Sequence, residues 1–598
     1  MKVVIVGAGP AGLVTCKSLL EASEEDFPFD PVVLEQEGGI GGTFRYRSYE
    51  HSYLVSSKQL TSFSDFRLPL SHSDHLTLDD YVQYLENYAK HFDLHSRIRL
   101  NSKVIKIERM SSGKHMVSYV QNIVNSDGKL EWESRPQKII ADYVALCAGL
   151  HVTPSIPQIS GIEHILRSSD SDGDNYPPAI FHSVQYKARS QLAGRHVMIL
   201  GSGETGMDLT YEAVKAGAKQ VILCSRSGFL SFPKALNDFE IFGMKFNSEN
   251  PVPIDSLITN LGETAYVHPW IARSHVRWFI SDFVIKHILW FLTGTHAGCN
   301  QWVGELEPER LGRAYVFLNK SHKAMPYLNR PYRTRPWYLD YISRYIDPPE
   351  DSPPLTNFVA ELAPFPTHFL MNGQAIFPLS KRKDAVRINK MIIKPDTVIY
   401  ATGYTQEFSY LDKASCYPSP QDADLRNIAR TGDEDFAFIG YIRPGVGAIP
   451  PLAEMQAFFW ISLIKKLVDM PLSPAYYHLL MPKSARIMYG VDHSTYASTL
   501  AKDMKTAPGL IELWWEYGSK VFICYCFGAS FTPFYRLFGP FRSEWAPGII
   551  KTEIWETITR RGVAGNLVMG LVPMIFYLTL NTIAYCLALL WRLFGKTV

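Results

Sequence analysis

Residues 7–12 have the glycine spacing of a turn that binds a pyrophosphate. The segment Gly7-Ala8-Gly9-Pro10-Ala11-Gly12 follows a β-branched run and opens a helical pattern. In such a turn the first glycine permits the tight bend, the second lets the backbone approach the phosphates, and the third lets helix and strand pack closely. The helix N-terminus adds N–H groups and a partial positive charge. We therefore expect a dinucleotide to contact Gly7, Gly9, Pro10, Ala11 and Gly12.

A carboxylate stands where such a site meets the ribose. Glu35 ends the next apolar run, 23 residues after Gly12. It can accept hydrogen bonds from both ribose hydroxyls and would repel a 2′-phosphate, so the site suits an unphosphorylated ADP moiety, as in FAD or NAD. The glycine-rich loop at residues 38–44 indicates close backbone approach to a ligand, which in flavoproteins is the rest of FAD. Gly42, Thr43 and Phe44 are the expected contacts in this loop.

A second glycine turn, at residues 201–206, has a basic partner instead. Arg226 follows the next apolar run, 20 residues after Gly206, and no acidic residue occupies that position. A guanidinium there suits a 2′-phosphate, so NADPH is favoured over NADH. The residues expected at this second site are Gly201, Gly203, Thr205, Gly206, Asp208 and Arg226.

Strand and helix patterns alternate around both turns. Such alternation predicts parallel sheets with helices on both faces, and hence an α/β fold with two Rossmann-like dinucleotide-binding domains and a C-terminal membrane helix. Residues 167–178 are acidic and predict a surface insertion, whereas residues 347–354 resemble a linker. The strands are expected at residues 2–6, 32–35, 143–147, 197–200, 221–224 and 397–400.

The composition is that of a globular protein. The 598 residues carry a formal net charge of +2 and are 46% hydrophobic, which excludes disorder along the whole chain and gives no general attraction to nucleic acid. The eight cysteines are scattered without metal-ligand spacing. We therefore expect no metal site, and a reducing compartment rather than a secreted, disulfide-linked protein.

The C-terminus has the composition of a membrane segment. Residues 566–591 contain no Asp, Glu, Lys or Arg, and about 20 such residues suffice to cross a bilayer. A transmembrane helix that leaves the catalytic bulk in the cytosol is the main interpretation, and a buried core helix is the alternative. Whether the tail spans the membrane or lies on it is left open. Residues 276–292 are expected to form an interfacial or substrate-entry helix or else plain core, and residues 521–535 to dip into the membrane surface.

These features together resemble the flavin-containing monooxygenases, and among them the membrane-bound, microsomal, dimethylaniline monooxygenase-like branch. The resemblance covers essentially the whole chain. It implies FAD and NADPH as cofactors, and oxygenation of an amine nitrogen or sulfide sulfur in a lipophilic small molecule by O2, through a C4a-hydroperoxyflavin. It also implies the endoplasmic reticulum membrane as the location. The motifs that carry it are residues 58–66, 182–186, 396–404, 440–456 and 527–544.

The resemblance also implies a division of the chain and a further pair of cofactor contacts. Thr402 and Gly403 fall where the family's chain crosses back to the FAD lobe. The expected parts are residues 1–157 (FAD-binding domain, first part), 158–403 (NADPH-binding domain with a helical insertion), 404–470 (return to the FAD-binding domain), 471–565 (membrane-proximal region) and 566–591 (transmembrane helix).

One departure from the family bears on the chemistry. The family's active-site Asn falls on Val55, which has no hydrogen-bonding side chain, so we expect Ser56 or Ser57 to replace its contact near the flavin, or oxygen activation to be altered. Phe44 also replaces a usual Trp, and His182 is either a ligand contact or structural. A Baeyer–Villiger-type oxygenase, an NADPH oxidase that produces hydrogen peroxide, and a membrane-tethered protein that keeps FAD structurally remain alternatives.

Overall fold

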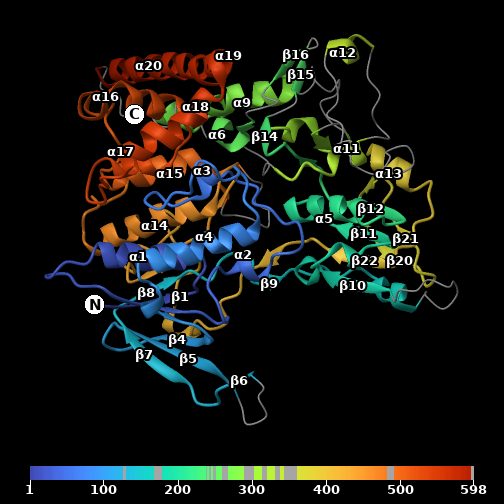
Figure 1. Cartoon of the computed structure of the whole chain (residues 1–598), viewed down its shortest axis with the longest axis horizontal. Helices are drawn as coiled ribbons and strands as arrows, with labels where there is room; N and C mark the ends of the chain where they lie inside the picture. The colour runs from blue at the N-terminus through green and yellow to red at the C-terminus, as the bar shows by residue number, and fades with distance from the viewer. Residues whose placement is uncertain are drawn as a thin grey trace.

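Two lobes, each built on a five-stranded parallel sheet, form most of the molecule (Figure 1). The computed structural model describes residues 1–124, 130–167, 178–236, 239–241, 244–246, 251–258, 267–288, 299, 302–312, 319–329, 337–342, 360–480 and 490–593. The linker predicted at residues 347–354 lies outside the described residues, and so does the insertion predicted at residues 167–178 apart from its two end residues.

The first sheet forms because its central strands are short apolar runs buried on both faces, as parallel sheets require. Helices α1 (Pro10–Glu21) and α14 (Ile449–Ile464) pack together against it, so a late segment of the chain completes the first lobe. Its strands lie in the order β24 (Phe436–Phe438), β8 (Tyr143–Leu146), β1 (Lys2–Val6), β2 (Asp30–Leu34) and β3 (Ile98–Arg99).

The second sheet repeats this plan around the second glycine turn. Helix α5 (Glu204–Lys215) follows its central strand and packs on it. All pairings within the sheet are parallel. The strand order is β10 (Ala179–His182), β22 (Thr397–Tyr400), β11 (His196–Leu200), β12 (Gln220–Cys224) and β19 (Ala360–Ala363). Six strands were expected from the sequence, and the structure confirms each within two residues.

Smaller elements join and extend the lobes. An antiparallel layer projects from the first lobe and consists of β4 (Ser102–Arg109), β5 (His115–Val124), β6 (Leu130–Trp132) and β7 (Gln137–Ala141). The two segments that cross between the lobes, β9 (Thr153–Pro154) and β23 (Tyr404–Thr405), pair antiparallel. The described part of the insertion between β12 and β19 includes α6 (Ile254–Ile258), α8 (Pro269–Ala272), η5 (His275–Trp278), α9 (Phe279–Phe283), η6 (Val284–Ile288) and α11 (Met325–Leu328).

The last hundred residues cover the first lobe with helices, drawn in orange and red at the upper left of Figure 1. One of them is long and apolar enough to cross a membrane, over residues 567–593. The chain runs through α15 (His493–Asp503), α16 (Leu510–Phe527), η10 (Thr532–Arg536), α17 (Ala546–Ile549), η11 (Ile550–Ile554), α18 (Trp555–Thr559), α19 (Gly562–Asn566), η12 (Leu567–Leu571) and α20 (Val572–Leu593).

The expectation for residues 521–535 is wrong. Val521, Phe531, Phe534 and Tyr535 are fully or almost fully buried, because this segment forms the core under the C-terminal helices. The exposed apolar side chains of this region lie earlier, at the start of α16. The described part of the segment predicted at residues 276–292, up to residue 288, forms the end of η5, then α9 and η6. Trp278 is buried, whereas Phe279 and Phe283 are about half exposed, so this segment is partly core and partly surface.

Candidate active site

The first glycine turn leaves a helix end open to a ligand. Gly9 is the N-cap of α1, and no side chain caps the first-turn N–H groups. Such groups need an outside partner, and an anion supplies one. Gly7 has φ +105°, and a Cβ there would lie 2.8 Å from the Cys147 carbonyl oxygen, so only glycine fits. A Cβ on Gly42 would lie 3.3 Å from Gly9 Cα, which means that two bare backbones face each other here.

These residues line a cavity of about 500 Å³ that opens at the carboxyl ends of the first sheet. This is the edge at which open parallel sheets bind ligands. The residues predicted as contacts in the first glycine turn and in the loop at residues 38–44 line this cavity, except Gly12. The wall includes Gly7, Gly9, Pro10, Ala11, Glu35, Gly42, Thr43 and Phe44, together with Ala148, Gly149, Gly440 and Pro450.

Glu35 lies at the rim of the turn, as expected. Its Oε2 accepts the Ala8 N–H at 2.6 Å and its Oε1 accepts the Glu37 N–H at 3.0 Å. Burial raises the pKa of this carboxyl, while the hydrogen bonds from Ala8 and Glu37 act in the opposite direction. Each oxygen keeps a lone pair for a further donor, so the carboxylate can still receive a ribose diol.

The second glycine turn has the same construction. Gly203 is the N-cap of α5 without a side-chain cap, and a Cβ built on Gly203 would meet nothing within 4 Å. A Cβ on Gly206 would lie 1.8 Å from the Gly201 carbonyl oxygen, so Gly206 permits the close packing of helix on strand. The open space beside Gly203 and the uncapped N–H groups fit a second phosphate group.

Arg226 stands exposed at the end of β12, next to this turn, with its guanidinium 5.7 Å from the centre of the Phe365 ring. A second guanidinium that the sequence did not single out holds its backbone. Arg382 Nη1 donates to the carbonyl oxygens of Ser225 and Arg226 at 3.0 and 2.8 Å, and its own charge is paired with Asp384. The Ser380–Lys383 run of polar and basic residues was the only signal for this position in the sequence.

Three predicted residues join the lobes. Asp208 Oδ2 accepts the Tyr49 hydroxyl at 2.8 Å, which links α5 to the first lobe. Thr402 Oγ1 donates to the Ser155 carbonyl oxygen, and Gly403 lies beside it in the crossover. His182 is structural: its Nδ1 accepts the Val184 N–H at 3.3 Å, so its Nε2 carries the proton and donates to the Gly403 carbonyl oxygen at 3.0 Å.

Val55 begins a segment that packs beside the C-terminal helices. It is half-buried and lies outside the wall of the 500 Å³ cavity. The hydroxyls of Ser56 and Ser57, which could replace the missing amide, already have hydrogen-bond partners within their own segment. Ser56 Oγ lies 2.6 Å from Thr61 Oγ1, and Ser57 Oγ accepts the Leu60 N–H as the N-cap of α3 (Lys58–Thr61).

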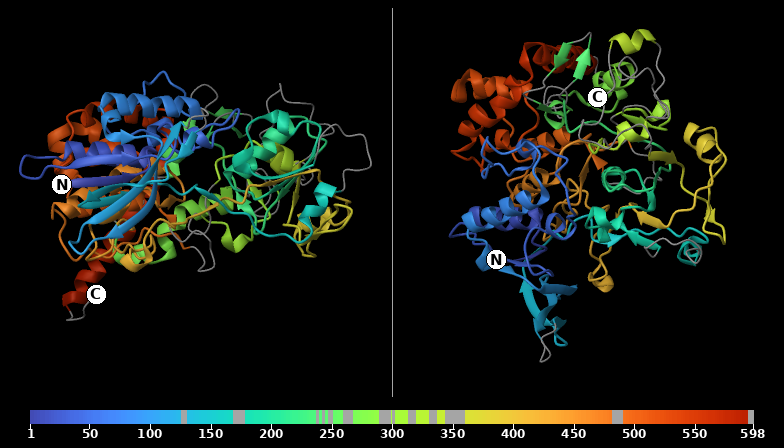
Figure 2. Two further views of the ribbon diagram at one scale, coloured as in Figure 1. Left: turned by 90° about the horizontal axis from the view of Figure 1, so that it is seen from below. Right: turned by 45° about the vertical axis from the view of Figure 1, so that its right-hand side comes forward.

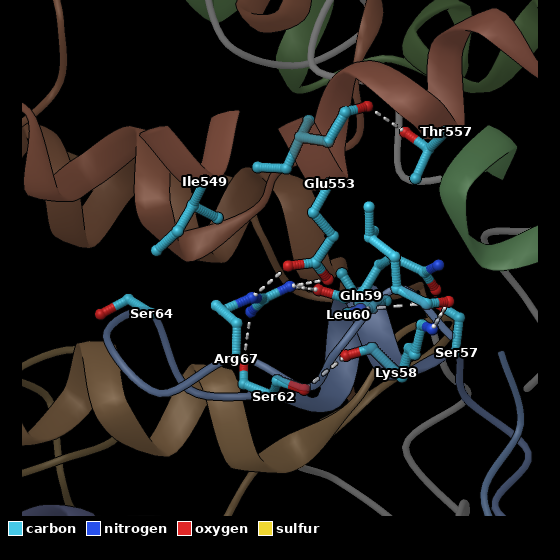
Figure 3. Close-up of polar contacts among 12 residues, drawn as sticks. Ser57, Lys58, Gln59, Leu60, Ser62, Ser64, Arg67, Ile549, Glu553 and Thr557 are labelled. Carbon is cyan, nitrogen blue, oxygen red and sulfur yellow. Dashed lines mark hydrogen bonds and ion pairs between the residues drawn. The ribbon is translucent and has the colours of Figure 1, made fainter. Parts of the chain in front are cut away.

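Figure 3 shows how this segment is held after Ser57. Arg67 reaches across to Glu553 of η11, and its guanidinium also donates to the carbonyl oxygens of Gln59 and Ser62 at 2.6 and 2.8 Å. The Ser57 N–H donates to the buried Asp255 carboxylate at 2.7 Å, and Lys320 Nζ lies 3.7 Å from the same oxygen. Asp255 directly, and Glu553 through Arg67, therefore hold the backbone that follows Val55.

Comparison with known proteins assigns the family. A model of the flavin-binding monooxygenase-like family matches residues 1–250. Monooxygenase PC-14 of Penicillium crustosum is 38% identical, over 97% of this chain and 97% of its own. The chain belongs to the flavin-binding monooxygenase-like family. Dimethylaniline monooxygenase [N-oxide-forming] 2 of Macaca mulatta is 25% identical over 92% of this chain and 91% of its own.

A solved structure shares the fold. The S-allyl-L-cysteine S-oxygenase of Allium sativum superposes with a TM-score of 0.50 at 15% identity, covering 94% of this chain and 98% of its own. As a member of the family, the chain is a flavin-dependent monooxygenase, and FAD and NADPH are its cofactors. The two uncapped helix ends, the bare backbones at Gly9 and Gly42, and the open space at Gly203 fit two such dinucleotides.

Proposed function

We propose that this flavin-dependent monooxygenase transfers one oxygen atom of O2 to a nitrogen or sulfur atom of a lipophilic small molecule, with NADPH as the electron donor. The observation that carries the proposal is a pair of uncapped helix ends on two parallel sheets. One is followed by the carboxylate of Glu35 and the other by the guanidinium of Arg226. We assign FAD to the first and NADPH to the second.

This assignment divides the chain as the sequence predicts. Residues 1–157 and 404–470 form the FAD-binding domain, and β24 and α14 of the second stretch support that grouping because both pack in the first lobe. Residues 158–403 form the NADPH-binding domain with its insertion. Residues 471–565 form the membrane-proximal region, and residues 566–591 make the membrane contact.

When bound, FAD would supply the redox chemistry that links NADPH to O2. The protein binds and orients the two cofactors and excludes water from them. The N–H groups of the two helix ends hold phosphates, Glu35 holds the ribose of FAD, and Arg226 holds the 2′-phosphate of NADPH. The Asp208–Tyr49 and Thr402–Ser155 hydrogen bonds keep the two lobes in register, so that hydride donor and acceptor meet.

The acceptor atom is a soft nucleophile. The relative from Macaca mulatta is named for N-oxide formation, which supports nitrogen, and a sulfide sulfur has comparable nucleophilic character. The apolar C-terminal helix supports a membrane location, for which we propose the endoplasmic reticulum with the catalytic part facing the cytosol. A lipophilic substrate concentrates in such a membrane.

Val55 supports a second candidate. A valine offers no hydrogen bond to the reacting groups, and the hydroxyls of Ser56 and Ser57 already have partners within their own segment. Weaker protection of the reduced cofactor from water would release hydrogen peroxide, as in an NADPH oxidase. A changed protonation state there would instead favour Baeyer–Villiger oxygenation of a ketone.

One experiment separates these activities. The purified, FAD-loaded full chain is mixed with NADPH and O2, and NADPH loss, peroxide release and product are measured with N,N-dimethylaniline, a dialkyl sulfide or a cyclic ketone. The proposal expects an N-oxide or sulfoxide in near-stoichiometric ratio to NADPH. Peroxide equal to NADPH with every substrate indicates the oxidase, and a lactone indicates the Baeyer–Villiger reaction.

A further inference from the structure

Helix α20, which the sequence predicts as a transmembrane helix, lies along the body of the protein for most of its length. Its buried residues recur at intervals of three or four and therefore form one stripe. The stripe covers roughly 22 Å of helix, at about 1.5 Å per residue. It consists of Pro573, Tyr577, Asn581, Ala584 and Ala588.

Two polar side chains of the stripe have partners on the body of the protein. Asn581 Oδ1 accepts the buried His268 N–H at 2.7 Å. The Tyr577 hydroxyl donates to the Arg277 carbonyl oxygen at 3.0 Å and accepts the Ile280 N–H at 3.3 Å. In hydrocarbon an amide side chain without a partner is costly. The stripe therefore has better partners on α8, η5 and α9 than a lipid bilayer could offer.

Aromatic ring contacts also hold α20 against the body of the protein. The Phe576 ring stacks on Phe279 at 5.3 Å between centroids, and the Tyr585 ring meets His268 edge-on at 4.6 Å. At the other end, a Cβ on Gly570 would lie 2.6 Å from the Phe527 ring, so η12 closely approaches the end of α16. Figure 1 shows α20 along the upper edge of the molecule, above α16, and the left view of Figure 2 shows its red C-terminal end projecting beyond the body.

The opposite side of α20 is exposed and apolar. We call this the apolar face. Leu578 is 67% exposed and Leu593 74%. Neighbouring elements add exposed apolar side chains, among them Phe283 on α9, Val568 on η12 and Trp515, which is 81% exposed, on α16. On α20 itself the face comprises Ile575, Leu578, Ile583, Leu587, Leu589, Leu590 and Leu593.

We propose that α20 lies in the plane of the membrane, with its stripe on the protein and its apolar face in the outer part of one leaflet, and does not cross the bilayer. This rests on the membrane location given under Proposed function. A crossing helix needs about 20 residues clear of the body. After Ala588, the last residue of the stripe, the described helix has only five more residues, ending at Leu593.

Lipid is the occupant that fits the apolar face. The run without Asp, Glu, Lys or Arg, residues 566–591, is far longer than a protein contact requires. Trp591 and Tyr585 on α20 and Trp514 and Trp515 on α16 are exposed. These are the side chains that favour the boundary between headgroups and acyl chains. Soluble monomers rarely expose contiguous apolar patches above a few hundred Å².

The orientation is tested with a C-terminal tag. The full chain is extended beyond Val598 by a flexible spacer of about 20 residues and an Asn-Gly-Thr glycosylation acceptor, and is expressed in yeast. We expect the tag to stay unglycosylated, and protease added to intact microsomes to remove it while a resident lumenal protein survives. A glycosylated, protease-protected tag would show that α20 crosses the membrane and overturn the proposal.

The apolar face is tested with a matched pair of variants. The double substitution Leu578→Ser/Leu587→Ser should lower binding of the FAD-loaded enzyme to phosphatidylcholine vesicles about tenfold or more, because both side chains leave the acyl boundary. The control Thr579→Ser/Thr582→Ser, on the same helix, should bind as wild type. If the face instead covers a second copy, the wild type will be a dimer in lipid-free buffer and the leucine variant a monomer with unchanged vesicle binding.

These outcomes are independent of the reaction. FAD content and NADPH oxidation by the leucine variant report whether the enzyme is intact. A failure of the proposed oxygenation would appear in product analysis and leave tag accessibility and vesicle binding unchanged.

Discussion

Arg67 and Glu553 form a two-point ion pair between parts of the chain 486 residues apart. Arg67 Nε donates to Glu553 Oε2 at 2.8 Å and Nη2 donates to Oε1 at 2.7 Å, and both side chains are almost fully buried. The pair connects the segment that follows Val55 to η11 of the C-terminal helices (Figure 3). A buried charge that loses its partner is strongly destabilising, so removing either Arg67 or Glu553 alone should cost more than removing both.

Glu553→Gln should therefore lower the free energy of unfolding by about 3 kcal/mol, because Arg67 stays buried and charged without a carboxylate. Urea denaturation measures this. The double variant Arg67→Met/Glu553→Leu removes both charges and should recover at least about half of the loss. Equal destabilisation by the single and double variants would mean that the pair contributes no coupling.

Gly9→Ala separates binding from folding. Its Cβ would meet nothing closer than Gly42 Cα at 3.9 Å, and its backbone is extended, so the apoprotein should fold as wild type. The methyl group would nevertheless stand where the pyrophosphate must approach. We expect the dissociation constant for FAD to rise about tenfold or more, measured by titration of the apoprotein. Gly548→Ala, whose Cβ would meet nothing within 4 Å, is the control and should bind FAD normally.

Arg226→Ala tests the assignment of NADPH to the second turn. A charge-assisted hydrogen bond to the 2′-phosphate contributes roughly 1.5–3 kcal/mol. The KM for NADPH should rise about tenfold or more while the KM for NADH stays within about twofold. Both constants come from the same steady-state assay, so NADH is the internal control. Equal increases for both nucleotides would refute the selectivity role.

Glu454 gives the stability a pH dependence. Burial and the nearby Asp65 raise the pKa of this carboxyl from 4.5 to about 7, although Arg536, the Ser64 hydroxyl and Lys17 oppose the shift. Between these values the native protein holds a proton that the unfolded chain has released. The free energy of unfolding should therefore fall as pH rises from about 4.5 to about 7, by on the order of 2–3 kcal/mol.

Denaturation curves at several pH values check this slope. Glu454→Gln should remove most of it, since a neutral amide does not titrate. Glu24→Gln, at an exposed site paired with Lys465, should leave the slope as it is. A wild-type curve that rises with pH across this window would show that Glu454 is charged in the folded protein.

The sequence predicted those features that depend on short stretches of chain. β1 and the turn at Gly7 follow from four consecutive β-branched residues and the glycine spacing, and the opposite charges of Glu35 and Arg226 distinguish the two turns. It could not predict contacts that depend on how distant segments pack. Arg382 at the second site and Asn581 on the predicted membrane helix carry no local signal. The buried segment around Phe534 has the composition of a surface anchor, and only its neighbours make it core.

Val55→Asn tests whether position 55 controls what becomes of reduced flavin. Val55 is half-buried beside a segment fixed by Asp255 and Glu553, so an amide fits there without a large change in volume. An amide adds both a donor and an acceptor, which the wild-type residue lacks. If Val55 lies at the reactive edge, the ratio of peroxide released to NADPH consumed should fall severalfold in the variant, with unchanged FAD content. Val55→Leu, which adds volume but no polar group, should keep the wild-type ratio. The same ratio in all three proteins would show that this position does not reach the flavin, and the oxidase interpretation would then lose its support.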